Sequence, residues 1–277
     1  MTQNALRTFG VKESTHLAAD LDKHLEEIKL VGYTILPNVL TSQELDEARV
    51  KMERIYQVQV AEIGGRQHLE AIGDTYTAMC LLAYDEFFLT LAIKPAVLGI
   101  VEQVLGDYYT LMLQNGIINV PELGDDQTAG YWHRDLGYQH FTSSRPLGIT
   151  ALYCIDDFNV ESGGTLVLPA SHKAEAFPSQ QFVGEHERSI TAPAGSVVVF
   201  DSMLYHRGGH NRSRNVRRGV NNIYTLPLIK QQISLPSILK GRYREDAFLS
   251  KFLGYESETD ANVDEFRQRR IRRKQEV

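Results

Sequence analysis

Two short strand-like runs meet at a tight turn in residues 188–201, which read Arg-Ser-Ile-Thr-Ala-Pro-Ala-Gly-Ser-Val-Val-Val-Phe-Asp. β-Branched and aromatic residues dominate 196–201, and these residue types favour extended backbone. The intervening Pro193-Ala194-Gly195 is typical of a turn, because proline presets φ and glycine accepts positive φ. We therefore expect short strands at 188–192 and 196–201, joined by a turn.

The same alternation of short strands and turns continues through the second half of the chain. Further strands are expected at 108–120, 129–134, 147–155, 164–168 and 217–226. Short strands without long alternating helices indicate an antiparallel sandwich or barrel, with the helices segregated to one side. We expect a mainly β protein with helices (α+β), whose core is a double-stranded β-helix, the cupin-like jelly roll.

Helical patterns dominate the chain before residue 107. Thr41-Ser42-Gln43-Glu44 forms a capping box, and Leu45, Ala48, Met52 and Ile55 then share one helical face. Two more helices are expected at 81–93 and 95–105, and a short strand at 33–36.

The chain has no internal repeat and no linker rich in Pro, Gly or Ser. We expect a single domain over residues 1–277. A mostly helical part at 1–106 would pack on a jelly-roll core at 107–228, followed by a C-terminal helical extension and charged tail at 229–277.

Composition excludes several classes of protein. The net charge of −6 argues against a broad nucleic-acid surface, and the basic run from Arg267 to Lys274 is interpreted as a solvated terminal helix or frayed end. Two cysteines are too few for a disulfide framework, so a reducing cytoplasm is expected. No apolar stretch is long enough to span a bilayer, and no signal peptide is evident. No nucleic-acid partner and no membrane partner are expected, and the oligomeric state is not predicted.

Three residues offer the ligands of an octahedral metal. His133 and Asp135 sit at positions i and i+2 of an expected strand, which places both on one face, and His206 follows an apolar strand end. Two imidazoles and one carboxylate are the donor set of non-haem Fe(II) oxygenases, and they leave three positions open. His24-Leu25-Glu26 has the same spacing but lies in a run typical of a solvated helix face, and His68-Leu69-Glu70 follows Gly64-Gly65 in an ambiguous stretch.

Several blocks of sequence resemble the phytanoyl-CoA dioxygenase family, in the family's order. They are Leu30 to Thr41, Trp132 to Asp135, Gly164 to Lys173, Gly195 to Asp201, and His206 through Asn211-Arg212-Ser213 to Arg217. The resemblance covers residues 25 to 228. It implies a jelly-roll oxygenase that depends on Fe(II) and 2-oxoglutarate.

The resemblance also implies roles for individual residues. His133, Asp135 and His206 would be the iron ligands, with His210 as the alternative third ligand. Arg217 would hold the distal carboxylate of 2-oxoglutarate, because a guanidinium pairs bidentately with a carboxylate. Arg218 is the alternative arginine for this role. Ser213 would donate a hydroxyl to the same carboxylate, or would form a turn after Asn211. His172 would have a structural or substrate-facing role.

Further contacts to 2-oxoglutarate are expected from polar side chains on the strands. Asn115 and Asn119 share one face of 108–120, which excludes Gln114 from that face unless the strand bulges; Thr150 is a similar candidate. For each of them an ordinary structural hydrogen bond is the alternative. The pocket mouth is expected to be built from residues 64–80 and from Tyr131, Arg134, Tyr138, His140, Arg145 and Arg207.

The partners are therefore expected to be a small-molecule substrate and dioxygen. The expected reaction is hydroxylation of a small biosynthetic or polar metabolite, with 2-oxoglutarate converted to succinate and CO2. Asp135 disfavours halogenation, because related halogenases carry Gly or Ala at that position. Desaturation, epimerisation or ring closure with the same cofactors are alternatives. A non-catalytic jelly-roll binding protein and a cupin-like enzyme using another metal are alternatives from other classes.

Overall fold

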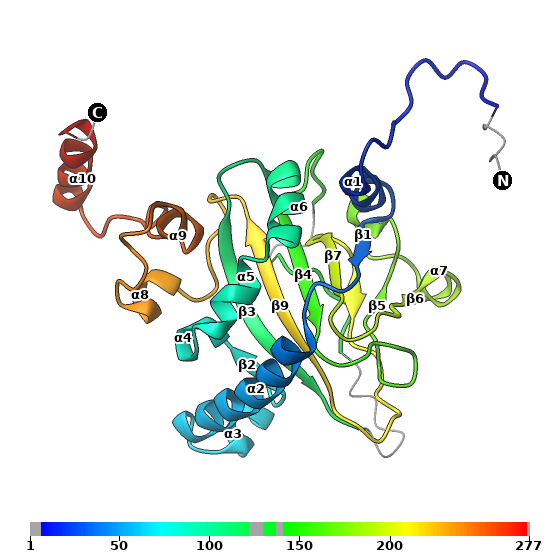
Figure 1. The fold of residues 1–277 in the computed structure, drawn as a ribbon, viewed down its shortest axis with the longest axis horizontal. Helices are drawn as coiled ribbons and strands as arrows, with labels where there is room; N and C mark the ends of the chain where they lie inside the picture. Colours follow the sequence, from blue (N-terminus) through cyan, green and yellow to red (C-terminus); the bar gives the residue numbers. More distant parts are fainter. Residues whose placement is uncertain (1–6, 122–129, 137–140, 276–277) are drawn as a thin grey trace.

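The computed structural model describes residues 7–121, 130–136 and 141–275, and it contains two antiparallel sheets with helices on one side (Figure 1). The strands are β1 (Tyr33–Leu36), β2 (Thr77–Met79), β3 (Thr110–Asn119), β4 (Gly148–Cys154), β5 (Leu166–Val167), β6 (Arg188–Ser189), β7 (Val197–Asp201), β8 (His206–Arg207) and β9 (Arg217–Thr225). The helices are α1 (Asp20–Val31), α2 (Ser42–Glu62), α3 (Arg66–Ala71), α4 (Leu81–Tyr84), α5 (Phe87–Ala92), α6 (Pro95–Leu105), η1 (Ser171–Lys173), α7 (Gln180–His186), α8 (Leu235–Leu239), α9 (Ala247–Phe252) and α10 (Val263–Gln275).

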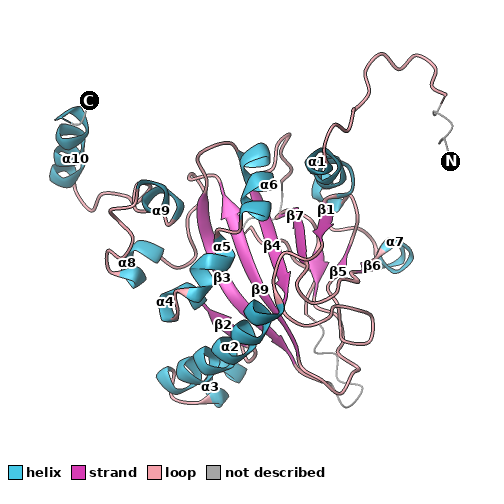
Figure 2. Cartoon of the chain, in the orientation of Figure 1, coloured by secondary structure: helices cyan, strands magenta, loops and turns pink. Residues whose placement is uncertain are grey.

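The larger sheet has six strands in the order β1-β7-β4-β9-β3-β2, and the smaller sheet has three in the order β6-β5-β8 (Figure 2). In the larger sheet β9 lies between β3 and β4, and its register pairs Arg217 with Asn119 and Asn221 with both Asn115 and Leu152. The pairing of β3 with β9 shifts between Leu111 and Leu113.

Helices α1, α2, α4, α5 and α6 cover the outer face of the larger sheet, and they form the main hydrophobic core with it. Ile149, Ala151 and Tyr153 on β4 point into this core. The Tyr153 hydroxyl donates to the Leu91 carbonyl at 2.6 Å, and the Tyr224 hydroxyl donates to the Ala92 carbonyl at 2.9 Å. These two buried hydrogen bonds fix α5 against the sheet.

The alternate residues of the same strands face the interior between the sheets. Leu152 and Cys154 of β4 pack with Val198 and Phe200 of β7 in a second cluster, together with Phe158. Since side chains alternate along a strand, Thr150 of β4 and Arg217 and Asn221 of β9 share this inner face. The predicted site residues Thr150 and Arg217 therefore both lie on the inner face.

Several expected elements are found close to their expected bounds. Helix α2 begins at Ser42, directly after Thr41, the N-cap of the expected capping box, and helix α6 begins at Pro95. Strands β3, β4, β7 and β9 fall within their expected ranges. Strands β5 and β6 are shorter than expected, and β2 and β8 were not expected.

The prediction of one helix over 81–93 is wrong, because the structure contains two short helices separated at Asp85. The Asp85 carboxylate accepts a hydrogen bond from the Phe87 backbone N–H at 3.1 Å and pairs with Lys51 and Arg54 of α2. A carboxylate that binds the backbone of the next turn competes with continuous helix.

The prediction of a strand over 129–134 is also wrong for the described part of that range. Residues 130–134 form only an isolated bridge, between His133 and His206. Residue 129 lies outside the described residues.

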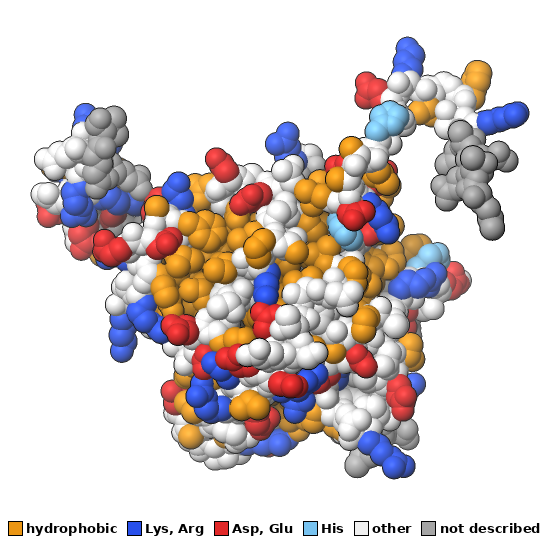
Figure 3. Space-filling view, in the orientation of Figure 1, with side chains coloured by type: hydrophobic (Ala, Val, Ile, Leu, Met, Phe, Trp, Pro, Cys, Tyr) orange, Lys and Arg blue, Asp and Glu red, His pale blue; other side chains and the backbone are white. Residues whose placement is uncertain are grey.

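Surface features match the charge pattern of the sequence. Figure 3 shows acidic and basic side chains intermixed over the lower part of this face, below a broad area of hydrophobic side chains. Helix α10, which contains the basic run, stands apart from the body of the molecule (Figure 1). Among the described residues, none of the helices combines the length and apolar character needed to cross a membrane.

Candidate metal centre

The backbone brings residues 133–135 alongside residues 202–206. His133 and His206 exchange two backbone hydrogen bonds of 3.0 Å, and the Asp135 N–H donates to the Ser202 carbonyl at 2.9 Å. On its other side His206 pairs with Val167 of β5. The polypeptide therefore sets the spacing of the three predicted ligands before their side chains are considered.

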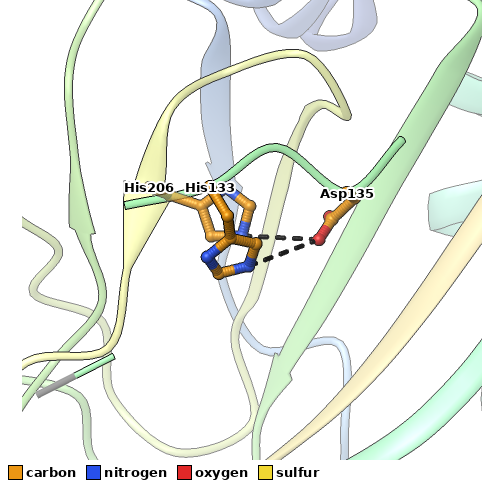
Figure 4. A group of neighbouring side chains, drawn as sticks. All are labelled: His133, Asp135 and His206. Carbon is orange, nitrogen blue, oxygen red and sulfur yellow. Dashed lines mark ion pairs between the residues drawn. The ribbon is translucent and has the colours of Figure 1, made fainter. Parts of the chain in front are cut away.

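The side chains of His133, Asp135 and His206 point toward one another (Figure 4). Asp135 Oδ1 lies 3.8 Å from His133 Nε2 and 3.5 Å from His206 Nε2. Each residue offers one ligand atom, and the three atoms lie within 4.8 Å of one another. The side chains of Asp135 and His206 are 6% and 8% exposed, whereas that of His133 is 46% exposed. The cluster is therefore open to a substrate on the side of His133.

Both imidazoles are held by the carbonyl two residues earlier in the chain. His133 Nδ1 lies 2.8 Å from the Tyr131 carbonyl oxygen, and His206 Nδ1 lies 2.9 Å from that of Leu204. A carbonyl only accepts, so each Nδ1 carries the hydrogen. Each Nε2 is then left to bind a cation, which is how metal-binding histidines are usually oriented.

Electrostatics also favour a cation at this point. Burial raises the pKa of Asp135, but the two imidazoles and a hydrogen bond from Thr150 outweigh it and hold that pKa below its usual value. Burial lowers the pKa of His206, but the Asp135 charge outweighs it and the pKa is raised. Burial and the neighbouring His206 lower the pKa of His133. The carboxylate thus stays charged and attracts positive charge to the point where the nitrogens converge.

The donor set fits a divalent transition metal. Two neutral nitrogens and one carboxylate oxygen on adjacent backbone segments match the facial arrangement of non-haem iron sites. Among the described residues, these three form the cluster of His, Cys, Asp and Glu able to hold a metal ion. His210 and His172 are not part of it.

Arg217 is buried in the interior, and Arg218 lies on the opposite face of β9. Arg217 is 2% exposed, its Nη2 donates to the Gly163 carbonyl at 2.9 Å, and its guanidinium lies over the Phe158 ring at 4.3 Å. Burial lowers the pKa of Arg217 to about 10, so it remains charged at neutral pH. Arg218 pairs instead with Asp156 at 3.1 Å. Of the two arginines, Arg217 is the one that faces the interior.

Several buried polar atoms on this inner face have no hydrogen-bond partner within the described part of the chain. They are Arg217 Nε, Asn115 Oδ1 and Asn221 Oδ1. Asn115 and Asn221 are direct cross-strand partners, and Asn221 is 7% exposed. Buried polar groups normally have partners. Arg217 Nε is a donor and suits the carboxylate of a keto acid, whereas the two amide oxygens are acceptors and require a donor from another group. Asn221 was not predicted from the sequence, although it is four residues after Arg217 and therefore lies on the same face of the strand.

The other side chains predicted to contact 2-oxoglutarate form hydrogen bonds within the protein. The Thr150 hydroxyl donates to Asp135 Oδ2 at 2.5 Å. The Ser213 hydroxyl donates to Asn211 Oδ1 at 2.6 Å, within the turn named as its alternative role. The Asn119 amide donates to the Gly209 carbonyl at 2.9 Å. Gln114 faces the helices, where it binds Leu82, Phe88 and Asn222. For Thr150 and Ser213, a contact with 2-oxoglutarate stays a prediction.

Arg134 does not belong to the pocket mouth, contrary to the prediction. It is 2% exposed, donates to the carbonyls of Ser171 and Ala174, and lies 4.0 Å over the Tyr205 ring. Burial lowers its pKa. Arg134 therefore anchors the 133–135 segment to the loop that contains η1.

The other residues expected at the mouth differ in position. Tyr131 is exposed, Arg145 is exposed, and Arg207 is partly buried against Glu187 and Trp132. Tyr138 and His140 lie outside the described residues.

The histidines set aside as ligands have other surroundings. His172 is buried, with Nε2 3.3 Å from the Lys29 carbonyl oxygen, which suits a structural role. His68 is exposed on α3. His24 does not lie on a solvated face as expected, because its side chain is 18% exposed and its Nδ1 lies 2.7 Å from Thr34 Oγ1.

Comparisons with known proteins agree with this geometry. The sequence matches the family model for phytanoyl-CoA dioxygenase (PhyH) over residues 28–219. An uncharacterized protein of Mycobacterium tuberculosis is 30% identical over 253 residues, covering 90% of this chain and 92% of that protein. Ectoine dioxygenase of Stutzerimonas stutzeri is 24% identical over 242 residues, covering 76% of this chain and 78% of that protein.

The fold is shared with solved structures. HygX from Streptomyces hygroscopicus, crystallised with nickel and 2-oxoglutarate bound, superposes with a TM-score of 0.59 at 20% identity, covering 77% of this chain and 90% of HygX. The predicted cupin-like jelly roll is confirmed. With a family match over most of its length, the chain belongs to the phytanoyl-CoA dioxygenase family of Fe(II)- and 2-oxoglutarate-dependent oxygenases.

Proposed function

We propose that the protein hydroxylates a small polar metabolite, with consumption of dioxygen and conversion of 2-oxoglutarate to succinate and CO2. The observation that carries this proposal is the convergence of His133, Asp135 and His206 in a barrel whose interior also holds the buried, charged Arg217. The reaction balances, because one oxygen atom enters the substrate and the other enters succinate.

In this proposal each ligand atom has a defined role. Nε2 of His133, Nε2 of His206 and Oδ1 of Asp135 hold iron, which supplies the oxidative chemistry when it is bound. Hydrogen bonds from both Nδ1 atoms fix the ring orientations and keep the nitrogens that face the metal unprotonated.

The far end of 2-oxoglutarate is assigned to Arg217. Its guanidinium can form two parallel hydrogen bonds with a carboxylate, and its Nε has no partner in the described residues. Phe158 and Gly163 hold the group in place and exclude water around it. The carboxamides of Asn115 and Asn221 give the same inner face of the sheet a polar surface.

A polar substrate is favoured over a long hydrocarbon chain. Two buried asparagine oxygens without a described partner require hydrogen-bond donors from whatever fills the interior. Ectoine, a small polar molecule, appears in the name of one relative. The free, buried thiols of Cys80 and Cys154 support a reducing, cytoplasmic location.

Anaerobic titration of the metal-free protein tests this proposal. Addition of Fe(II) and then 2-oxoglutarate should produce the weak visible charge-transfer band of the chelate. Exposure to air should then yield succinate, even without substrate. A protein that gives neither the band nor succinate would refute the assignment. Product analysis with candidate metabolites would separate hydroxylation from desaturation, epimerisation and ring closure.

A further inference from the structure

We infer that Thr150 and Ser202 form a hydroxyl chain that orients the Asp135 carboxylate, so that Oδ1 alone faces the metal. Both are positioning residues, because neither touches the cation itself. The inference rests on the proposed function, and it assigns Thr150 a role other than the contact with 2-oxoglutarate predicted from the sequence.

The distances define the chain. Thr150 Oγ1 lies 2.5 Å from Asp135 Oδ2, and Ser202 Oγ lies 2.9 Å from Thr150 Oγ1. Thr150 and Ser202 are both fully buried. Two hydroxyls removed from water in this way act on each other and on the carboxylate rather than on solvent.

The direction of the hydrogen bonds follows from the number of protons. An ionised carboxylate only accepts, so Thr150 donates its single hydroxyl proton to Asp135 Oδ2. Thr150 Oγ1 must then accept the proton of Ser202. The order is Ser202 to Thr150 to Asp135, and each hydroxyl donates once.

This order leaves the two carboxylate oxygens with different tasks. Oδ2 is engaged by Thr150, whereas Oδ1 faces the two Nε2 atoms at 3.8 and 3.5 Å. A carboxylate fixed in this way contributes one oxygen to a metal and not two. One-oxygen binding preserves the three positions that an organic chelate and dioxygen need.

The fold holds both hydroxyls by their backbones. Thr150 lies on β4 opposite Phe200 of β7, and Ser202 follows the end of β7. The Ser202 N–H donates to the Gly148 carbonyl at 3.1 Å, and its own carbonyl accepts from the Asp135 N–H at 2.9 Å. Ser202 therefore holds Asp135 twice, by its backbone directly and by its hydroxyl through Thr150.

Gly148 leaves the space that this arrangement needs. A Cβ atom at residue 148 would lie 2.9 Å from Ser202 Oγ and 3.0 Å from Thr225 Cγ2. Its φ is not in the left-handed region, so the close approach of the hydroxyl explains the glycine better than backbone strain does.

The test separates metal binding from 2-oxoglutarate binding. Mn(II) affinity of the metal-free protein would be measured from the EPR signal of free Mn(II), and 2-oxoglutarate affinity would be measured at saturating Mn(II). Thr150→Val removes the hydroxyl and keeps the shape, while Thr150→Ser keeps the hydroxyl. Thr225→Val is the matched control, because Thr225 is buried on the inner face of β9 and its hydroxyl has no partner among the described residues.

We expect Thr150→Val to raise the dissociation constant for Mn(II) about 10-fold or more, as is typical for loss of an outer-shell partner. Ser202→Ala should raise it less, and Thr150→Ser and Thr225→Val should leave it within about twofold of the wild type, on the same basis. The affinity for 2-oxoglutarate at saturating metal should not change. If circular dichroism shows that Thr150→Val is unfolded, the Mn(II) affinity of Ser202→Ala tests the inference instead.

Two results would overturn the inference. Unchanged Mn(II) affinity in folded Thr150→Val would show that the hydroxyl does not orient the ligand. Weakened 2-oxoglutarate binding with unchanged Mn(II) affinity would instead support the contact predicted from the sequence. Failure of the wild-type protein to bind Mn(II) would refute the proposed function itself, and the two failures are thereby distinguishable.

Discussion

Replacement of Arg217 by Lys should weaken 2-oxoglutarate binding without removing the positive charge. A guanidinium presents two parallel N–H groups to a carboxylate, whereas an ammonium presents a single point of contact. A hydrogen bond to a charged group contributes about 1.5–3 kcal/mol, and about 1.4 kcal/mol corresponds to a factor of ten in affinity. Loss of one such bond should raise the dissociation constant about 10- to 150-fold.

The structure supplies a matched control in the neighbouring residue. Arg218 has the same charge and lies on the same strand, but it points outward and pairs with Asp156. Arg218→Lys should therefore leave the affinity for 2-oxoglutarate unchanged. The assay is anaerobic titration of the Fe(II)-loaded protein with 2-oxoglutarate, followed through the visible band. Because Arg217 also donates to the Gly163 carbonyl, the thermal midpoint of each variant should be measured first.

Equal affinities of wild type and Arg217→Lys would refute the assignment of Arg217 to the distal carboxylate. A loss shared equally by Arg217→Lys and Arg218→Lys would refute it too. Such a loss would show that the effect comes from a general disturbance of β9 and not from a defined contact.

Three further predictions concern the metal ligands, a buried hydroxyl and an ion pair. Asp135→Asn and His206→Ala should each abolish Fe(II) binding in equilibrium dialysis, whereas His172→Ala, which alters a histidine outside the cluster, should retain it. Tyr153→Phe should lower the free energy of unfolding by about 1–3 kcal/mol in urea titration, because the Leu91 carbonyl loses its buried donor. Burial raises the pKa of Asp85, but the effects of Lys51, the Phe87 N–H and Arg54 outweigh burial. The folded-state pKa of Asp85 therefore lies below its usual value. The stability that Asp85 contributes is therefore fully present above its unfolded-state pKa and is lost as the pH falls. The difference in unfolding free energy between wild type and Asp85→Asn should shrink as the pH falls below about 4. A difference that does not depend on pH would contradict this prediction.

The features that could be predicted from the sequence are those set by a local pattern of residue types. Alternation in 217–226 predicted that only one of Arg217 and Arg218 faces the interior, and the structure shows which. The capping box at Thr41 predicted the start of α2, because that signal is local. The ligand cluster was predictable because the residue types and their order are restrictive.

Other features depend on tertiary contacts that the pattern does not contain. Strand β8 has two residues, and its extended conformation depends on pairing with β5. Two residues are too few to show a periodic pattern of apolar and polar side chains. The break at Asp85 comes from ion pairs with α2. Arg134 was predicted at the pocket mouth, but it is buried against the carbonyls of Ser171 and Ala174 and the Tyr205 ring.

Asp135 and Arg217 are two of the buried charged residues, and the ligand proposed between them accounts for both. Asp135 gives the metal site a negative charge, and Arg217 places a positive charge elsewhere on the same inner face. An isolated buried charge is costly unless it is paired. Within the described part of the chain, Arg217 contacts a neutral carbonyl and an aromatic ring. A divalent cation would compensate the charge of Asp135 and leave one positive charge over. A dicarboxylate that binds this cation at one end and the guanidinium at the other would compensate both positive charges. On this argument the buried arginine is stabilised fully only in the complex, so 2-oxoglutarate should raise the thermal midpoint of the metal-loaded wild type but not of Arg217→Met.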